Sequence, residues 1–337
     1  MHLRTIFISA ILAALSSSVA AQSPATDFSG KTISLYIGFS AGGGYDLYGR
    51  AVGRHMGKHM PGSPAVVPRN MGGGGSLRAA NYMAELAPRD GTAIATIGRG
   101  TVFAPLMGQP GANFDATAFA WLGSANEEAS TCIAWHTSGV SSFDDLKKKD
   151  LILASTVATD DASQLPKLLN GLLGTRFKVI LGYPGGAQMN KAIESGEVQG
   201  RCGLSWGSFK ATHSRWVESK LVSPLFQVAL TRHPDLLHVP LLMEYASTDE
   251  QKQMLATFVA RQVMGRPFFA PQGLPGDTVT LLRSAFDATM RDSEFVAEME
   301  KLRLEVNAVT GARVQELVTE IHRTPRHVIK KMMELSE

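Results

Sequence analysis

Short apolar segments that suit β-strands alternate with longer segments of helical periodicity along the first hundred residues. The strand-like segments cover residues 33–37, 65–67 and 92–97 and are rich in β-branched and aliphatic side chains. Between them, residues 46–60 and 77–86 repeat apolar side chains every three to four positions, as a helix does when one face is buried. Strand, loop and helix in repeated succession predict a parallel sheet with helices on its faces.

The same alternation begins again near residue 127. Ser142 and Asp145 form a capping box for a helix that ends near Lys149, and Gly174 closes a later helix. From Thr248 the chain is mainly helical. The sequence therefore predicts an α/β protein of two units with a helical tail. In the second unit, strands are predicted at 130–136, 151–155, 177–183, 198–204 and 225–230, and helices at 162–173 and 187–195.

The N-terminus has the three parts of a secretory signal. Arg4 supplies a positive charge, residues 6–15 are apolar, and Ala20 and Ala21 end a run of small residues that suits a cleavage site. The apolar run is too short to cross a bilayer, which takes about 20 residues. Residues 1–21 are therefore predicted to be a signal peptide, cleaved after Ala20 or Ala21, and the mature protein is expected in the periplasm.

The net charge bears on the kind of partner, and the cysteine content bears on whether a disulfide forms. The formal net charge is +3, and no stretch interleaves basic and aromatic residues, so a nucleic-acid partner is not expected. Cys132 and Cys202 are the two cysteines, and both lie in the exported part of the chain. Two thiols in an oxidising compartment often pair, so a Cys132–Cys202 disulfide is predicted, with two buried free thiols as the alternative.

Glycine clusters stand at two junctions between a predicted strand and the following helix. Residues 42–44 are the first cluster and residues 72–75 the second. Glycine allows close approach of the backbone to a ligand, and a helix N-terminus offers free N–H groups and a positive dipole end. Two such loops at the carboxyl ends of parallel strands predict one anion-binding crevice. Asp46 is expected either to contact the ligand or to orient the first loop.

Enzyme motifs match less well. Neither glycine cluster has the spacing of a dinucleotide fingerprint, and no Gly-Lys-Ser/Thr follows either one. The segment 203–207 fits the Gly-x-Ser-x-Gly pattern, so a secreted serine hydrolase that uses Ser205 stays an alternative. Its partners would be Asp235 with His238, or Asp292 with His322. His55 and His59 share a helix face without a zinc-protease glutamate between them, so no metal is predicted and a solvated basic face is expected.

Six motifs, taken in order, resemble the Bug-type receptors, which are the periplasmic solute-binding proteins of tripartite tricarboxylate transporters. They are Phe39-Ser-Ala-Gly-Gly-Gly-Tyr-Asp46 with Arg50, the loop 67–76, Ala87-Pro-Arg-Asp-Gly-Thr92, Tyr183-Pro-Gly-Gly186, Gly196-Glu-Val198 and Phe269-Ala-Pro-Gln-Gly-Leu-Pro275. The resemblance covers nearly the whole mature chain.

The resemblance implies a two-lobed periplasmic binding protein of type II, the Venus-flytrap kind, with a ligand cleft between the lobes. Lobe one is expected at 30–124 plus 228–337, and lobe two at 125–227. The implied function is capture of a small organic anion, expected to be a carboxylate, and its delivery to a membrane permease. No catalysis, no cofactor and a monomer are expected. A receptor that senses its ligand without transport remains an alternative.

The family's binding positions carry over to both lobes of this chain. The family loop corresponding to residues 155–162 is rich in Gly and Ser, whereas here it contains two acids that would repel a carboxylate. Tyr45 and Trp206 replace smaller family residues and are expected to add an aromatic wall to the pocket, with core packing as the alternative. Arg99 ends a strand and is expected to clamp a second carboxylate, or else to face solvent. The candidate ligand-binding residues are Ser40, Ala41, Gly42, Gly43, Gly44, Tyr45, Asp46, Gly74, Gly75, Ser76, Arg99, Thr156, Thr159, Tyr183 and Trp206.

Overall fold

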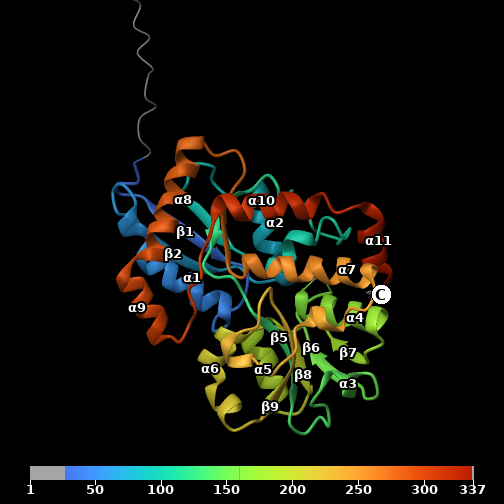
Figure 1. The fold of residues 1–337 in the computed structure, drawn as a ribbon. Coiled ribbons are helices and arrows are strands. Elements are labelled where there is room, and N and C mark those ends of the chain that lie inside the picture. Colours follow the sequence, from blue (N-terminus) through green and yellow to red (C-terminus); the bar gives the residue numbers. More distant parts are fainter. Residues whose placement is uncertain (1–26, 159, 336–337) are drawn as a thin grey trace, which may run out of the picture.

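The computed structural model describes residues 27–158 and 160–335 and divides them into two α/β lobes (Figure 1). Each lobe is built on one mixed sheet, with six strands in lobe one and five in lobe two. The predicted signal peptide lies outside the described residues. Within the described residues, no helix combines the length and the apolar character needed to span a bilayer.

The lobe-one sheet has the strand order β11-β4-β10-β3-β1-β2. Strand β1 pairs in parallel with β2 and β3, as the repeated strand–helix pattern predicts, whereas β10 returns from the distant tail and pairs antiparallel with β3 and β4. The strands are β1 (Thr32–Ile37), β2 (Ala65–Asn70), β3 (Ala93–Thr96), β4 (Ala120–Ser124), β10 (Pro267–Ala270) and β11 (Val309–Thr310). The helices are α1 (Gly44–His55), α2 (Leu77–Glu85), α8 (Gly276–Arg291), α9 (Ser293–Lys301) and α10 (Gly311–His322).

The lobe-two sheet has the order β7-β6-β8-β5-β9. Strands β6, β7 and β8 are parallel, and β5 pairs antiparallel with β8 and β9. The strands are β5 (Ser130–Trp135), β6 (Leu151–Ala154), β7 (Phe177–Ile180), β8 (Gly200–Ser205) and β9 (Val222–Val228). The helices packed in this lobe are α3 (Phe143–Leu146), α4 (Asp161–Leu173), α5 (Gly186–Glu194), α6 (Trp206–Glu218), α7 (Asp249–Ala260) and α11 (Arg326–Leu335).

Local signals account for several of these boundaries. The predicted capping box is present, since the Ser142 hydroxyl accepts from the Asp145 N–H while the Asp145 carboxylate accepts from the Ser142 N–H. Gly174 ends α4 in the left-handed conformation, with φ of 70°. Strand β4 and helix α6 have no counterpart among the predicted elements. Helix α6 begins at its N-cap Ser205, the residue that the sequence motif presented as a nucleophile.

Two helices of the tail pack in lobe two and not in lobe one, where they were expected. Apolar side chains of α7, including Leu255 and Phe258, and of α11, including Val328, belong to the same buried cluster as Leu168 of α4. Sheet membership changes after β4 and after β9, close to the expected boundaries. The tail therefore passes to lobe two, back to lobe one and to lobe two again, because each amphipathic helix buries its apolar face on the nearest uncovered sheet or helix (Figure 1).

A disulfide joins Cys132 of β5 to Cys202 of β8. The two strands are antiparallel neighbours in the lobe-two sheet, and both side chains are fully buried. The bond closes a segment of 70 residues that contains α3, β6, α4, β7 and α5. It therefore links the first strand of lobe two to the strand that carries much of the cleft described next.

Candidate ligand site between the two lobes

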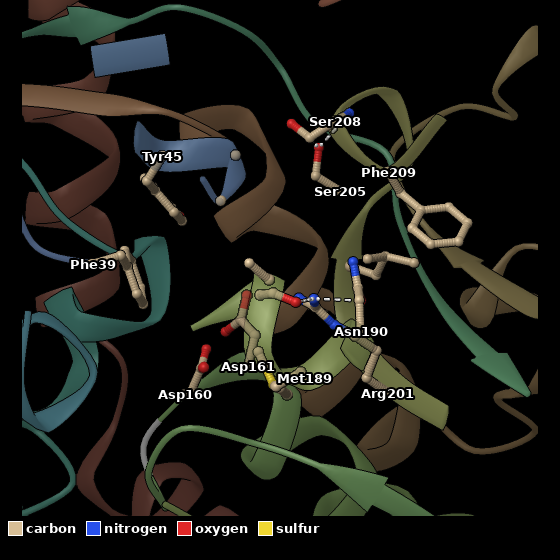
Figure 2. Close-up of a pocket in the computed structure, with 18 of the residues that line it drawn as sticks. Phe39, Tyr45, Asp160, Asp161, Met189, Asn190, Arg201, Ser205, Ser208 and Phe209 are labelled. Carbon is tan, nitrogen blue, oxygen red and sulfur yellow. Dashed lines mark hydrogen bonds between the residues drawn. The ribbon is translucent and has the colours of Figure 1, made fainter. Parts of the chain in front are cut away.

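A cavity of about 100 Å³ lies between the lobes, at the end of β1 in lobe one and of β8 in lobe two (Figure 2). Its walls come from loops that approach each other closely across the cleft. A Cβ atom on Gly44 of lobe one would lie only 2.9 Å from the Ser208 Oγ atom of lobe two, so glycine is needed for this approach. The residues used below that line the cavity are Phe39, Ser40, Gly42, Gly43, Gly44, Tyr45, Arg99, Asp160, Asp161, Met189, Asn190, Arg201, Ser205, Ser208, Phe209 and Arg266.

The first glycine loop reaches the cavity, and Asp46 holds it in place from behind. The Asp46 carboxylate accepts from the Gly42 N–H at 3.0 Å, from Arg50 Nε at 3.0 Å and from Asn70 Nδ2 at 2.8 Å. Burial raises the pKa of Asp46, but these three donors outweigh burial and leave the pKa below its ordinary value. Asp46 is buried and does not line the cavity, so of the two expected roles the structure shows the orienting one. Ala41 is exposed and also lies off the cavity.

Replacing Asp46 by alanine is expected to lower the free energy of unfolding by about 1–3 kcal/mol, because the Gly42 N–H and the Arg50 guanidinium lose a buried charged acceptor. Ligand affinity should fall with it, since Gly42 and Gly43 line the cavity. Chemical denaturation measures the first effect. Asp249→Ala, at an exposed acid in the first turn of α7, serves as the matched control and should change little. Equal stability of the two variants would contradict the orienting role.

The second glycine cluster lines an adjoining groove and not the cavity itself. Gly74 and Gly75 face Thr156 and Tyr183 across this groove, and Phe39 and Ser40 lie between the groove and the cavity. Gly75 has φ of +61°, and a Cβ atom there would lie 2.4 Å from the Val157 side chain of lobe two. The cluster thus permits contact between the lobes, and the expectation of a single crevice served by both loops is corrected.

Three of the expected ligand-binding hydroxyl groups form hydrogen bonds within the protein: those of Ser76, Thr156 and Tyr183. The Ser76 hydroxyl donates to the Gly38 carbonyl at 3.1 Å and accepts from the Gly98 N–H at 3.2 Å, which ties three loops together below the cavity. Thr156 donates to Asp160 Oδ2 at 2.7 Å. Tyr183 hydrogen-bonds to Glu197. Thr159 lies outside the described residues.

Arg99 reaches across the cleft but is committed to a protein partner. Its Nε donates to Asp161 Oδ2 at 2.8 Å, and its side chain is 4% exposed, so it does not face solvent and its charge is paired with a protein carboxylate. Arg261 donates to the other oxygen of Asp161, also at 2.8 Å. Burial raises the pKa of Asp161, but Arg99 and Arg261 outweigh it, and the pKa lies below its ordinary value. Asp161 is therefore neutralised by two arginines and does not oppose an anion.

Of the two residues expected to form an aromatic wall, Tyr45 contributes to the cavity and Trp206 does not. Tyr45 lines the cavity, with its ring stacked on Phe39 at 4.7 Å and the Arg266 guanidinium 4.5 Å from its centroid. Trp206 does not line it. Its ring is 2% exposed in the lobe-two core, so the alternative of core packing holds. Phe209, one helical turn further along α6, does line the cavity, although its side chain is also 2% exposed and belongs to the same core cluster.

Arg201 is the residue that the sequence analysis missed. It lies in β8 and extends toward the cavity, where one of its terminal nitrogens donates to the Asn190 Oδ1 atom at 3.2 Å and to the Gly186 carbonyl at 3.1 Å (Figure 2). Its Nε is buried without a hydrogen-bond partner. Among the described residues, no carboxylate lies within ion-pair distance of Arg201. Burial lowers its pKa to about 10. An arginine inside an otherwise apolar and glycine-containing strand was the available signal.

Ser205 lines the cavity but has none of the partners that a hydrolase needs. Its hydroxyl accepts from the Ser208 N–H as the cap of α6, and it hydrogen-bonds to the Ser208 hydroxyl at 3.2 Å. Within residues 27–158 and 160–335, no histidine hydrogen-bonds to it. Three of the four expected partners are engaged elsewhere: Asp235 binds Trp206 and Lys210, His322 contacts the Val102 carbonyl, and Asp292 binds Lys58. His238, the fourth, is exposed. The serine–histidine–aspartate arrangement is therefore not assembled around Ser205.

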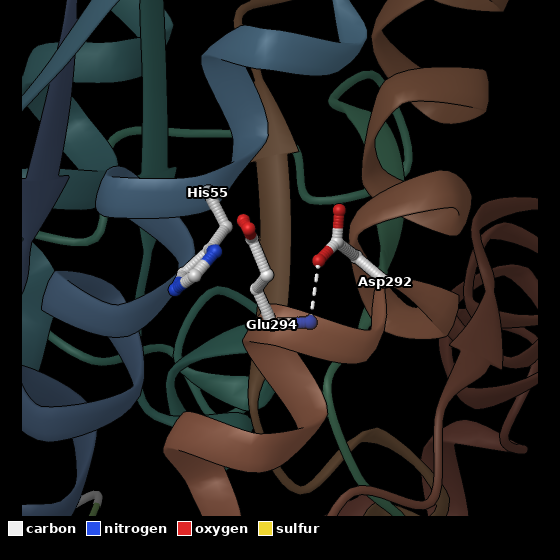
Figure 3. Close-up of side chains that lie close together, drawn as sticks. All are labelled: His55, Asp292 and Glu294. Carbon is white, nitrogen blue, oxygen red and sulfur yellow. Dashed lines mark hydrogen bonds between the residues drawn. The ribbon is translucent and has the colours of Figure 1, made fainter.

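His55 and His59 are not a solvated basic face. His59 Nε2 lies 2.9 Å from Asp292, and His55 bonds to a further acid of α9 at 2.7 Å. Figure 3 shows His55 beside Asp292 and Glu294, a trio with the composition of a metal site. The Lys58 ammonium pairs with both of these acids, so a protein cation already balances their charge. The cluster is an ion-pair contact between residues 55–59, at and after the end of α1, and residues 292–298, at the start of α9.

Comparison with known proteins addresses the fold. No protein-family model and no curated protein matches the sequence. Among solved structures, the periplasmic binding protein BugD is 22% identical with a TM-score of 0.72, covering 89% of this chain and 97% of its own. MatC from Rhodopseudomonas palustris with bound malate is 19% identical with a TM-score of 0.69, covering 91% and 99%. A second R. palustris protein, with adipate, is 19% identical with a TM-score of 0.69, covering 90% and 97%. The predicted architecture is confirmed: this chain has the two-lobed α/β fold of the periplasmic binding proteins.

Proposed function

We propose that this protein is an extracytoplasmic receptor that binds a small organic anion, in the first instance a carboxylate, between its two lobes. The observation that carries the proposal is Arg201. A guanidinium that is buried at the edge of a cavity, with an unpartnered Nε and no carboxylate partner, is held there at an energetic cost. Binding an anionic group recovers that cost, since a guanidinium matches a carboxylate in shape and charge.

The surroundings of Arg201 favour an anion as well. Three arginines and two aspartates line the cavity, and Asp161 is shared between Arg99 and the nearby Arg261. Arg266 is balanced by Glu128 at 2.9 Å. From the opposite lobe, the N-terminal turn of α1 begins at Gly44 on the cavity wall and brings the positive end of the helix dipole. Two of the three structural neighbours named above were solved with adipate and malate, which are dicarboxylates.

The leader pattern and the fold together support a proposed location and a proposed partner. The N-terminal 21 residues read as an export signal, which places the receptor in the periplasm. A periplasmic receptor acts by closing its lobes on a ligand and presenting the closed form to a membrane permease, here of the tripartite tricarboxylate type. Gly44 approaches Ser208 closely, and Gly75 approaches Val157 closely, so the two lobes touch at these two places.

A thermal-shift screen of the purified protein tests the proposal. The library should hold dicarboxylates, tricarboxylates, aromatic acids and the amide of each acid. An acid present at 100 times its dissociation constant should add about 2.7 kcal/mol of stability, which a melting curve detects. Stabilisation by an acid and none by its amide is the expected result. If no acid of the library shifts the melting temperature, or if amides act as strongly as acids, the anion receptor is wrong.

A further inference from the structure

Asp160 is an acid on the cavity wall that the protein leaves without a cation. It is the N-cap residue of α4, yet its carboxylate makes no capping bond to the first turn of that helix. An N-cap aspartate ordinarily accepts from a backbone N–H two or three positions later. Here the carboxylate accepts from the Thr156 hydroxyl at 2.7 Å and lines the cavity. Within the described part of the chain, no basic side chain lies within ion-pair distance of it.

The neighbouring acid, Asp161, has its negative charge fully balanced by arginines. Asp161 receives one guanidinium on each oxygen, from Arg99 and Arg261. Asp160, one residue earlier, receives none, although Arg201 lines the same cavity (Figure 2). Asp160 and Arg201 attract each other through space but form no ion pair, so the described residues present to one ligand space a negative and a positive group that both lack a direct charged partner.

A ligand with only carboxylate groups satisfies Arg201 but brings a like charge toward Asp160. A ligand with an ammonium group beside its carboxylate satisfies both. The Phe39 ring agrees with this assignment, since it lines the cavity and an aromatic face attracts cations, whereas the Tyr45 ring is already in contact with Phe39 and Arg266. Building on the proposed function, we infer that the receptor takes a zwitterionic ligand of the amino-acid class, with its carboxylate on Arg201 and its ammonium on Asp160.

A rival reading keeps Asp160 protonated, so that its hydroxyl donates to a carboxylate ligand. Burial does raise the pKa of Asp160, with the Thr156 hydroxyl opposing this. The two readings differ in what asparagine does at this position. An amide NH₂ replaces a protonated carboxyl as a donor to a carboxylate, but it cannot offer a negative charge to an ammonium group. Asp160→Asn therefore separates them, and asparagine also remains a good N-cap residue.

The experiment compares each of the twenty standard amino acids with its deaminated acid of the same carbon skeleton, such as aspartate with succinate and alanine with propanoate. Thermal shift selects the pairs, and isothermal titration calorimetry gives dissociation constants for wild type and Asp160→Asn. Asp144→Asn, at an acid of lobe two that is 81% exposed, is the matched control. We expect at least one amino acid to bind at least tenfold more tightly than its deaminated partner. Asp160→Asn should reduce that preference below threefold, whereas the control should keep it.

Each other outcome counts against a defined claim. Deaminated acids that bind as tightly as the amino acids, or plain acids alone that bind, overturn the zwitterion assignment and leave the anion receptor standing. A preference for the amino acid that survives Asp160→Asn overturns Asp160 as the ammonium site. Affinity of the wild type for plain acids that rises as the pH is lowered assigns Asp160 the donor role. Silence with every acid contradicts the proposed function itself. The wild-type comparison decides between these outcomes even if Asp160→Asn fails to fold.

Discussion

Replacing Arg201 by glutamine is expected to weaken binding of the anionic ligand by about two to three orders of magnitude, or about 3–4 kcal/mol. Arg201 has no carboxylate partner among the described residues, so the ligand is the group that balances its charge. Glutamine keeps a donor for the Asn190 and Gly186 oxygens that Arg201 contacts. Titration calorimetry with the ligand found in the screen measures the loss.

The stability of the ligand-free variant distinguishes a binding arginine from a structural one. Burial lowers the pKa of Arg201 to about 10, which means that the empty protein is penalised for keeping the charge there. The melting temperature of ligand-free Arg201→Gln should therefore equal or exceed that of wild type. Arg176→Gln, at an exposed lobe-two arginine paired with Asp150, makes the same charge change away from the cavity and should keep the affinity. A large loss of stability with unchanged affinity would assign Arg201 to the framework.

Asp161→Asn is expected to lower the free energy of unfolding by about 3–5 kcal/mol, the largest stability effect predicted here. The substitution leaves two buried guanidinium groups without their counter-charge. Arg261 is fully buried and lies between the rings of Phe103 and Phe258, at 3.6 Å and 3.9 Å from their centroids, so water cannot replace the lost carboxylate. Denaturant unfolding at neutral pH, followed by circular dichroism, measures the effect.

The pH dependence gives this prediction a second readout. The pKa of Asp161 is lower in the folded protein than in the unfolded chain, so its contribution is present above the unfolded pKa of about 4 and is lost as the pH falls through the folded value. The stability gap between wild type and Asp161→Asn should thus narrow only in acid. Asp150→Asn removes an exposed ion pair with Arg176 and should cost at most about 1 kcal/mol. A similar cost for both variants would contradict a structural role for the buried network.

Local sequence signals predicted the elements well where the determining interactions are themselves local. The segments around β1, α1, β2 and α2 appear in the predicted order, because strand alternation and helical periodicity are set by neighbours within a few residues. The Ser142–Asp145 capping box and the Gly174 terminator are short-range bonds of the same kind. The glycine loop at Gly44 could also be predicted, since a glycine-rich junction between strand and helix marks a place where the backbone must closely approach a ligand or another part of the protein.

Local sequence signals could not predict the direction of individual side chains or which charged groups pair with each other. Trp206 and Phe209 lie three positions apart on α6 and are both buried in the lobe-two core, yet only Phe209 also lines the cavity, and the packing of that helix against its sheet decides which of the two does so. The tail helices α7 and α11 have ordinary amphipathic patterns, and such a pattern does not indicate which lobe the helix packs against. Their assignment required the whole three-dimensional arrangement, because hydrophobic burial is non-directional.

The sequence by itself predicted an α/β protein with an export signal and with a glycine loop suited to an anion, because such signals, periodicity and loop chemistry are carried by contiguous residues. The tertiary structure decided which charges remain for a ligand. Asp160 and Asp161 are adjacent, and both looked repulsive toward a carboxylate, but Arg99, 62 residues away, and Arg261 neutralise only the second. Charge pairing depends on distances of a few ångströms between groups brought together by the fold, so Arg201 and Asp160 became visible as the uncommitted pair only when both lobes were in place.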